Sequence, residues 1–412
     1  MTARTPHRIR RLGKLTLVNI FLALLALASL SYAVVTAPAN GKDLFTFQQG
    51  AKNWLTRSYQ FGAGPGQMYP PFTLPLFSPL TLFSFEHALL LMLALNLAAT
   101  AAIIYFTVKL WGARWSNQAI IFFAAFFLSW APYRVTLRLG QISLIIVALL
   151  LGALLARQKK NNWLAGALLG ISLCKYSLTL PFFLYFLWKR EWKLIAAAVT
   201  VMAALTQVFA WHLGITALDA TLNYIHSVGQ LYAVKVYAFT GTTEIKMLIL
   251  SLTGGKVALA TAMNIALSLA ALVCLAVVVR LSPKCEATHL AALAAFAMWS
   301  AYHRTYDAML CIIPSAVLID FYARGRFVRF SRFWIAALGL FIISVPGLLT
   351  ERLKLSEADL LANPAGWLGL HIESLLVFAL FWSMLWLAWK RGAAPEQINE
   401  RREPEASPAP AS

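Results

Sequence analysis

The residues best suited to chemistry stand in one short stretch, WSAYHRTYDAML, which runs from Trp299 to Leu310. It places His303, Arg304 and Asp307 within five residues, whereas the sequence on both sides is apolar and typical of helices. A histidine can hold a phosphate or position an acceptor, an arginine can bind phosphate, and a carboxylate can act as general base. Alternatively, Arg304 and Asp307 form a local ion pair that holds the turn, and His303 marks a helix end.

Six other polar residues interrupt apolar sequence and are candidates for the same site: Asp43, Tyr69, Arg134, Arg138, Gln141 and Lys175. Asp43 is either a general base or the N-cap of the helix that follows it. Arg134 and Arg138 lie one helical turn apart, and are either phosphate ligands or residues that reach from the membrane toward water. We interpret Tyr302 and Tyr306 as anchors at the membrane interface.

Lys175 stands in the middle of a long apolar run, where a cation is costly and needs a partner. A lipid phosphate suits it better than any carboxylate that is near in the sequence. If Lys175 has no anion in the folded protein, its removal should raise thermal stability, because an unpaired buried charge is unfavourable.

These residue types limit the chemistry. The sequence contains no P-loop and no serine or cysteine motif typical of nucleophilic catalysis. One base and several cations suit a transfer reaction whose donor is already activated by a phosphate link. Such a reaction requires no cofactor and no metal ion. The four cysteines have no spacing that indicates a zinc site or a disulfide framework.

The composition predicts an all-α, polytopic membrane protein. Of 412 residues, 60% are hydrophobic and 12% are charged, whereas soluble proteins have about 25% charged residues. Runs such as 15–35, 89–110 and 256–281 are long enough to cross a bilayer. The net charge of +19 comes from basic residues clustered in short turns between these runs, which indicates cytoplasmic loops and argues against a nucleic-acid partner.

Walking along the chain with the basic turns inside predicts about 10–12 transmembrane helices with both termini in the cytoplasm. We expect a basic cytoplasmic N-terminus at 1–14, a single transmembrane domain at 15–391 and a disordered cytoplasmic tail at 392–412. Residues 163–188 have basic turns at both ends, which predicts a helical hairpin with Lys175 at its tip. Residues 216–233 have apolar positions at helical spacing and predict an amphipathic helix on the outer surface.

This topology places the candidate residues on one side of the membrane. All of the acids, bases and cations named above fall on the outer side or at outer membrane depth. Ionisable residues at such depth are costly and usually face a cavity. The sequence therefore predicts one site that opens to the periplasm or the cell exterior.

Four motifs, in this order, carry a resemblance. Tyr69-Pro70-Pro71 opens an apolar helix after an early aspartate, and Gly140-Gln141 starts another helix. Lys175 ends the Gly-rich run LAGALLGISLCK, and a histidine-bearing turn precedes a helix that contains Pro314. Over roughly residues 15–350 the chain resembles glycosyltransferase family 87, whose members include mannosyltransferases that use polyprenyl-phosphate mannose. Many members follow Gly-Gln with asparagine, whereas this chain has Ile142-Ser143.

The resemblance implies a GT-C-type bundle, an outward-facing active site, a polyprenyl-phosphate sugar donor and inversion at the sugar. It implies that Asp43 is the base and that His303 and Lys175 match the family's outer histidine and buried lysine. We therefore expect a hexosyltransferase of the plasma (inner) membrane that passes a mannose-like sugar to a hydroxyl of a lipid or cell-envelope glycan. In the expected site Asp43 is the catalytic residue. The expected ligands of the donor phosphate are Lys175, Arg134, Arg138 and His303. The residues expected to position the substrate are Tyr69, Gln141, Arg304 and Asp307.

Two other readings of the sequence compete with this one. A transporter or lipid flippase also needs charged residues at membrane depth. Transporters often contain internal repeats, and the sequence has none that we detect. A non-catalytic assembly protein that binds polyprenyl phosphate is the third possibility.

Overall fold

The computed structural model describes residues 6–37, 41–62, 69–234 and 242–393, and helices account for most of these ranges. Within these ranges there is no β-strand, although an isolated bridge pairs Thr242 with Arg304. The prediction of an all-α, multi-pass membrane protein is confirmed. The predicted disordered tail lies outside the described residues from 394 onward, as do residues 1–5 of the predicted basic N-terminus.

The elements of the first half are α1 (Pro6–Thr36), α2 (Lys42–Leu55), α3 (Thr73–Phe77), η2 (Ser78–Leu82), α4 (Phe85–Trp111), η3 (Gly112–Arg114), α5 (Asn117–Leu128), α6 (Ala131–Leu139), α7 (Ser143–Gln158), α8 (Asn162–Ser172), η4 (Leu173–Lys175), α9 (Tyr176–Trp188) and α10 (Trp192–Leu213). Those of the second half are α11 (Ala217–Val234), α12 (Ile245–Leu252), α13 (Val257–Leu281), α14 (Glu286–Ser300), η5 (Thr305–Cys311), α15 (Ile312–Ala323), α16 (Val328–Leu338), α17 (Leu340–Ile343), α18 (Val345–Gly347), η6 (Leu348–Arg352), α19 (Glu357–Leu361) and α20 (Pro364–Ala393).

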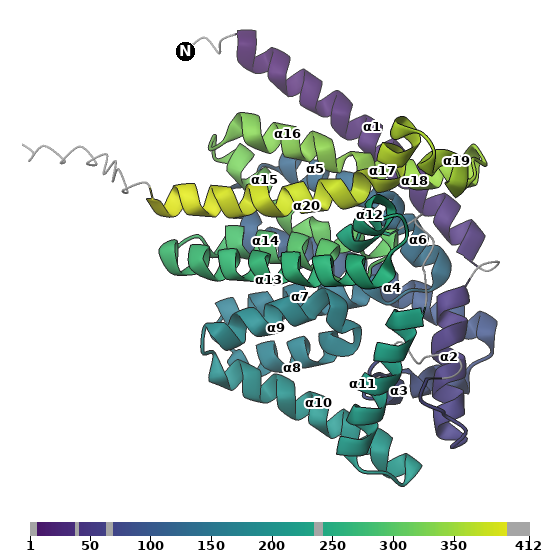
Figure 1. Ribbon diagram of the computed structural model, residues 1–412. Coiled ribbons are helices and arrows are strands. Elements are labelled where there is room, and N and C mark those ends of the chain that lie inside the picture. Colours follow the sequence, from purple (N-terminus) through teal and green to yellow (C-terminus); the bar gives the residue numbers. More distant parts are fainter. Residues whose placement is uncertain (1–5, 38–40, 63–68, 235–241, 394–412) are drawn as a thin grey trace, which may run out of the picture.

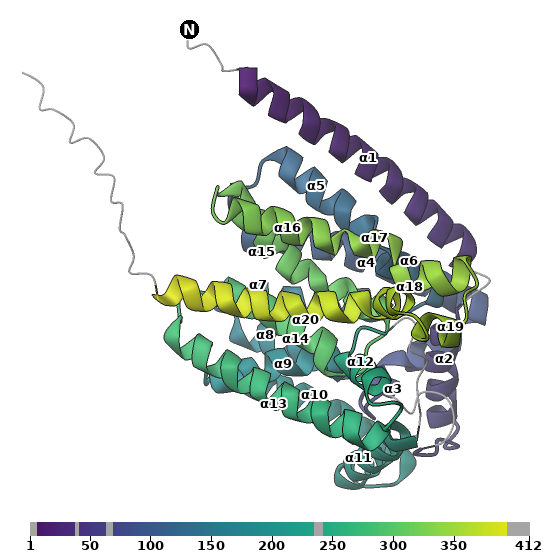
Figure 2. The ribbon, with the colours of Figure 1, turned by 45° about the horizontal axis from the view of Figure 1, so that its top comes forward.

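The two ends of the helical bundle are formed by different elements. The first turn of α1 and the last turn of α20 lie at one end, which we call the terminal end (Figures 1 and 2). Helices α2, α3 and α19 lie at the opposite end, which we call the pocket end. Helix α1 begins at Pro6, so most of the basic segment predicted at 1–14 is the start of a helix.

Fewer helices than predicted are long enough to cross a bilayer. Among the described residues, eight helical segments have the length and composition of a membrane span, or nine if α5 and α6, which meet at 54°, form one span. The eight include residues 162–188 as one segment, although the chain reverses direction within it, as described below. The predicted 10–12 included α7 and α14, which have 16 and 15 residues, and both arms of the hairpin. Because a full span needs about 20 residues, these helices are too short by that criterion.

The predicted hairpin at 163–188 is confirmed by its contacts. Arg157, at the end of α7, pairs with Glu191 at 2.7 Å and with Glu286 at 3.0 Å. The residues that precede α8 and those that follow α9 therefore lie at the same end of the bundle. Lys175 has non-helical backbone angles, φ −118° and ψ 67°, where η4 gives way to α9. The chain turns back at that residue, so Lys175 is the tip of the hairpin.

Small residues let this hairpin pack closely against α10. A Cβ atom added at Gly166 would overlap the carbonyl oxygen of Leu194, and one at Gly170 would lie 2.7 Å from the carbonyl oxygen of Ala198. Any larger side chain at these two positions would therefore separate α8 from α10.

Helix α11 is the predicted amphipathic surface helix. Ala220 and Tyr224 are buried against the bundle, while Leu218, Leu222 and Ile225 are exposed. The apolar stripe thus faces outward, as expected of a helix that lies on a bilayer surface.

The centre of the protein is built by α14, η5 and α15. Every residue from Leu290 to Trp299 is buried, as is almost all of α15. The polar stretch that begins at Tyr302 therefore interrupts the most buried part of the chain, which places Asp307 in the interior.

Candidate active site

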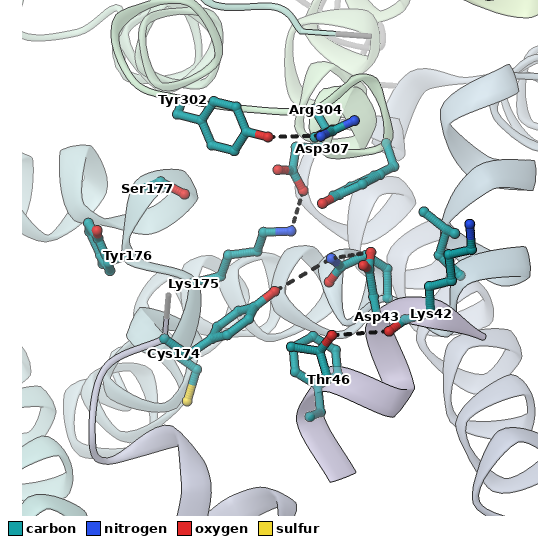
Figure 3. Close-up of a pocket in the computed structure, with 15 residues that line it drawn as sticks. Lys42, Asp43, Thr46, Cys174, Lys175, Tyr176, Ser177, Tyr302, Arg304 and Asp307 are labelled. Carbon is teal, nitrogen blue, oxygen red and sulfur yellow. Dashed lines mark hydrogen bonds and ion pairs between the residues drawn. The ribbon is translucent and has the colours of Figure 1, made fainter. Parts of the chain in front are cut away.

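A cavity of about 440 Å³ opens at the pocket end between α2, the α6–α7 junction, the hairpin tip and η5 (Figure 3). Cavities of roughly 300–1,000 Å³ are typical of small-molecule sites. Its lining joins residues that are far apart in the sequence: Lys42, Asp43, Thr46, Phe47, Tyr69, Leu139, Gln141, Cys174, Lys175, Tyr176, Ser177, Tyr302, Arg304, Tyr306 and Asp307.

Asp43 lies in the first turn of α2 and is half-buried in the cavity wall. Its carboxylate accepts a hydrogen bond of 2.9 Å from the side-chain amide of Gln141. Burial raises the pKa of Asp43 above its usual range, although the Lys175 ammonium and the Gln141 amide act in the opposite direction. The N-cap of α2 is Gly41, and no side chain caps this helix, so the interpretation of Asp43 as a helix cap is wrong.

Gln141 is fixed by its own contacts. Its side-chain oxygen accepts from the Ile142 N–H at 2.8 Å, and its backbone oxygen accepts from the Asn96 side chain at 3.0 Å. The amide nitrogen that faces Asp43 is also 3.5 Å from the Tyr69 hydroxyl. The structure therefore brings Asp43, Tyr69 and Gln141 together, as the sequence predicts.

The glycine before Gln141 has two reasons to be a glycine. Gly140 ends α6 with φ +64°, in the left-handed region that side chains disfavour. A Cβ atom there would also lie 2.7 Å from the Cβ of Leu44 on α2. Gly140 thus lets α2 approach the α6–α7 junction, which sets the position of Asp43 relative to Gln141.

Asp307 holds a buried ion cluster at the floor of the cavity. It forms an ion pair with Lys175 and accepts a hydrogen bond from the Ser143 hydroxyl at 2.6 Å, while Lys175 donates to the same hydroxyl at 2.8 Å. His303 contacts the second carboxylate oxygen at 3.1 Å through Nδ1 and lies 3.2 Å from the Ser177 carbonyl oxygen through Nε2. Figure 3 shows Lys175 and Asp307 pointing toward each other across the cavity.

This cluster bears on two interpretations of the sequence. Lys175 has a carboxylate partner 132 residues away in the sequence, whereas we expected a lipid phosphate to suit it better than any carboxylate near in the sequence. The proposed local pair between Arg304 and Asp307 is wrong, because Arg304 donates to the Tyr302 hydroxyl at 2.8 Å. His303 is fully buried behind Asp307 and does not line the cavity.

The two carboxylates therefore differ in what they can do. Asp307 is 3% exposed and bound to a lysine, a serine and a histidine. Such contacts stabilise a fixed anion and leave it little capacity to take up a proton. Asp43 is more exposed and contacts a neutral amide, so it is the carboxylate that a ligand in the cavity can reach.

Two exposed cations, Lys42 and Arg304, line the cavity. Lys42 was not among the candidates from the sequence, although it stands next to Asp43 at the start of a predicted helix. Tyr302 and Tyr306 line the same cavity, and the Lys175 ammonium lies 4.8 Å from the centre of the Tyr306 ring. Both tyrosines therefore belong to the cavity wall, a position that we did not assign to them from the sequence.

Arg134 and Arg138 lie on another face of α6. Arg134 donates to the Ser129 carbonyl oxygen at 3.0 Å and to the Ile342 carbonyl oxygen at 3.2 Å. Arg138 lies over the ring of Tyr32 on α1, 5.5 Å from its centre. Neither arginine lines the cavity that contains Asp43, so the structure does not bring them to the predicted site.

Within the described ranges, no three histidine, cysteine, aspartate or glutamate side chains converge in a way that could hold a metal ion.

The cavity offers a reachable carboxylate, two exposed cations and an internally neutralised ion pair. This set can remove a proton from a hydroxyl group and hold an anion close to it.

Comparison with known proteins gave one finding. The sequence model of glycosyltransferase family 87 matches residues 68–313, which is more than half of the chain. The matched segment includes Tyr69, Gln141, Lys175 and Asp307, and begins after Asp43. A search of curated proteins and a search of solved structures gave no match.

Proposed function

The chain belongs to glycosyltransferase family 87, and from this premise we propose that it transfers a hexose from a polyprenyl-phosphate donor to a hydroxyl of a lipid or cell-envelope glycan. Family membership makes it a membrane glycosyltransferase. The nature of the donor, the acceptor and the mechanism are parts of the proposal.

The observation that carries the proposal is the contrast between the two carboxylates. Asp43 is reachable, and burial raises its pKa, which makes it a better proton acceptor than an ordinary aspartate. In the proposed reaction Asp43 takes the proton of the acceptor hydroxyl. The hydroxyl oxygen bonds to the anomeric carbon from the face opposite the phosphate. The carbon–oxygen bond to the phosphate breaks, and polyprenyl phosphate leaves with the electron pair.

The leaving phosphate needs positive charge near it, because negative charge develops there in the transition state. Lys42 and Arg304 are exposed at the cavity and are the first candidates for that role. Lys175 adds positive charge at the floor, where Asp307 balances it. Because Arg134, Arg138 and His303 do not line the cavity, we leave them out of the donor site.

The distribution of charge supports a proposal for the side of the membrane that the site faces. The turns after α7, α9 and α15 carry the basic runs RQKKNN, KREWK and RGRFVR, which are typical of cytoplasmic loops. Arg157 and Glu191 join two of these turns. We therefore propose that the cavity, at the pocket end, faces the periplasm or the exterior of the plasma membrane.

The direct test is to reconstitute the purified protein in nanodiscs with a panel of polyprenyl-phosphate sugars and candidate lipid acceptors. We expect one donor to be consumed with formation of polyprenyl phosphate and a glycosylated acceptor, whereas nucleotide sugars remain intact. Movement of donor lipid across a vesicle bilayer without sugar transfer would favour the flippase reading. Donor binding with neither transfer nor movement would favour an assembly protein.

Replacing either exposed cation of the cavity, by Lys42→Gln or Arg304→Gln, should raise KM for the donor. A hydrogen bond to a charged group contributes about 1.5 kcal/mol or more, which corresponds to roughly tenfold in KM. Steady-state kinetics with varied donor measures this change. Lys256→Gln is the matched control, because Lys256 is an exposed cation that does not line the cavity. An unchanged KM in both cavity variants would remove these residues from the phosphate site.

As the pH is lowered, the activity should begin to fall at a higher pH than it would if the base were an aspartate of ordinary pKa. The base must be deprotonated to act, and the pKa of Asp43 is raised by burial, so protonation inactivates the enzyme at a higher pH. Gln141→Leu removes a hydrogen bond that lowers the pKa of Asp43. The acid limb of kcat/KM should therefore move further upward in this variant. An acid limb that does not respond to Gln141→Leu would exclude Asp43 as the titrating base.

A further inference from the structure

Helix α20 contributes two buried polar residues, Glu373 and Ser374, that hydrogen-bond to segments beside the cavity. We call them the α20 clamp. We propose that the clamp positions Arg304, by holding the backbone on both sides of this residue, so that its side chain meets the donor phosphate. The inference rests on the proposed function. It names residues that lie outside the segment 68–313 matched by the family model.

Glu373 is an acid in the interior of a membrane protein. It is 1% exposed and belongs to the segment Pro364–Gly392, which has the length and composition of a membrane span. No described lysine, arginine or histidine forms an ion pair with it. A carboxyl group in such surroundings is costly, and its presence indicates a specific partner. That partner is Thr305, whose hydroxyl donates to Oε2 of Glu373 at 3.0 Å.

Thr305 stands between two residues of the cavity wall. Arg304 precedes it and Tyr306 follows it, and both of these line the cavity, whereas Thr305 does not. Its side chain is instead engaged with Glu373 on α20. The hydrogen bond therefore fixes the chain at the point between two side chains that face a ligand.

The next residue of α20 acts on the segment that pairs with Arg304. The Ser374 hydroxyl donates to the Thr242 carbonyl oxygen at 3.3 Å, and Thr242 forms the isolated β-bridge with Arg304. The Thr243 N–H donates to the His303 carbonyl oxygen at 3.1 Å. Two successive residues of one helix thus hold both segments of the bridge.

Arg304 consequently combines a fixed backbone with an exposed side chain. Its guanidinium donates to the Tyr302 hydroxyl at 2.8 Å, and it lines the cavity. Ordering a flexible residue when a ligand binds lowers affinity, so a residue held in place beforehand binds more tightly. The clamp should therefore influence donor binding through Arg304, although neither clamp residue lines the cavity.

The first test is steady-state kinetics with varied donor. Glu373→Leu and Thr305→Val each remove the hydrogen bond, so each should raise KM several-fold with kcat nearly unchanged, approaching the roughly tenfold rise expected of Arg304→Gln. Glu373→Gln keeps an oxygen that can accept from Thr305, and should restore KM to near the wild-type value. If Glu373→Leu does not fold, Thr305→Val carries the test, because it only replaces a hydroxyl by a methyl group.

Leu376→Ala is the control. Leu376 is buried in the same helix, so its truncation weakens the packing of α20 but leaves the hydrogen bond to Thr305. It should lower thermal stability without raising KM for the donor. An equal rise of KM in Leu376→Ala would make the effect of Glu373→Leu one of helix packing and would overturn the proposal.

A double variant shows whether the clamp acts through Arg304. Once the guanidinium has been removed, a shift of its backbone has little left to change. Glu373→Leu combined with Arg304→Gln should therefore have about the same KM as Arg304→Gln alone. If the two effects on KM multiply, or if Glu373→Leu lowers kcat at an unchanged KM, Glu373 does not position Arg304.

Hydrogen exchange of the full-length protein in nanodiscs tests the clamp without sugar transfer. The amides of residues 303–306 should exchange faster in Glu373→Leu than in the wild type, but not in Glu373→Gln. If this difference is found and no polyprenyl-phosphate donor is consumed, the proposed function is wrong and the clamp does not serve a donor phosphate. If donor is consumed but neither KM nor exchange responds to Glu373→Leu and Thr305→Val, the proposed function holds and the clamp is wrong.

Discussion

Asp43→Asn is expected to reduce sugar transfer by about 10²–10⁴-fold, the usual effect of losing a positioned general base. Asparagine keeps the shape of the side chain and can still contact Gln141, but it cannot accept a proton. The variant should fold, because Asp43 does not cap α2, and it should still bind donor lipid. Single-turnover transfer and donor binding, measured on the same preparation, separate the loss of chemistry from the loss of binding.

Two further variants sharpen this result. Asp43→Glu should also be poor, because one additional methylene displaces the carboxylate by about 1 Å, and misplacement on that scale can cost about 10²-fold. Asp219→Asn is the control, because Asp219 is an exposed aspartate whose N–H and carboxylate both contact Thr216 at the start of α11. It should transfer sugar normally. Full activity in Asp43→Asn would leave the proposed mechanism without its base, since Asp307 is already bound to Lys175.

The second large effect concerns stability. Lys175→Met is expected to lower the free energy of unfolding by about 3–5 kcal/mol, because it leaves the buried Asp307 carboxylate without its lysine. From the sequence alone we expect the opposite change, a gain in stability on removal of Lys175, because a buried cation without an anion is unfavourable. The ion pair with Asp307 reverses that expectation. Denaturation of the purified variants, followed by tryptophan fluorescence, measures the difference.

A double variant tests whether the pair is the cause. Lys175→Met combined with Asp307→Leu removes both charges, so it should be more stable than Lys175→Met alone. The double variant should nevertheless transfer little sugar, because the floor of the cavity has changed. Lys42→Met is the matched control, since Lys42 is an exposed lysine of the same cavity and should change stability by less than about 1 kcal/mol. If the effects of Lys175→Met and Asp307→Leu on the free energy of unfolding simply add in the double variant, the two charges are not coupled and this explanation is wrong.

The sequence could predict features that depend on local composition. Basic turns at both ends of one apolar run are sufficient to indicate the hairpin and to place Lys175 at its tip. The order of Asp43, the Tyr-Pro-Pro turn and Gly140-Gln141 was sufficient to join three cavity residues through a family resemblance. The physical reason for the glycine, its contact with Leu44, required the structure.

Features that depend on how helices rotate and meet could not be predicted in this way. The spacing of Arg134 and Arg138 shows that they share a helix face, but not that this face contacts α1. The pairing of Lys175 with Asp307 joins residues 132 apart, and nothing near either residue indicates it. An alternation of basic turns counts every reversal of the chain, including reversals by helices of 11 to 16 residues, so it gives a higher number than the eight or nine candidate spans that length and composition identify among the described residues.

The hairpin has a consequence for how the protein is made. By length and composition, residues 162–188 qualify as one membrane span, and a translocon that reads hydrophobicity alone would thread them straight through. Basic residues on both flanks oppose that outcome, since both flanks favour the cytoplasm. The close contacts of Gly166 and Gly170 with α10 can form only after residues 194–201 have been synthesised. The correct topology of this segment is therefore secured by a helix that emerges later from the ribosome, and Lys175 reaches the floor of the cavity only when that helix has been inserted.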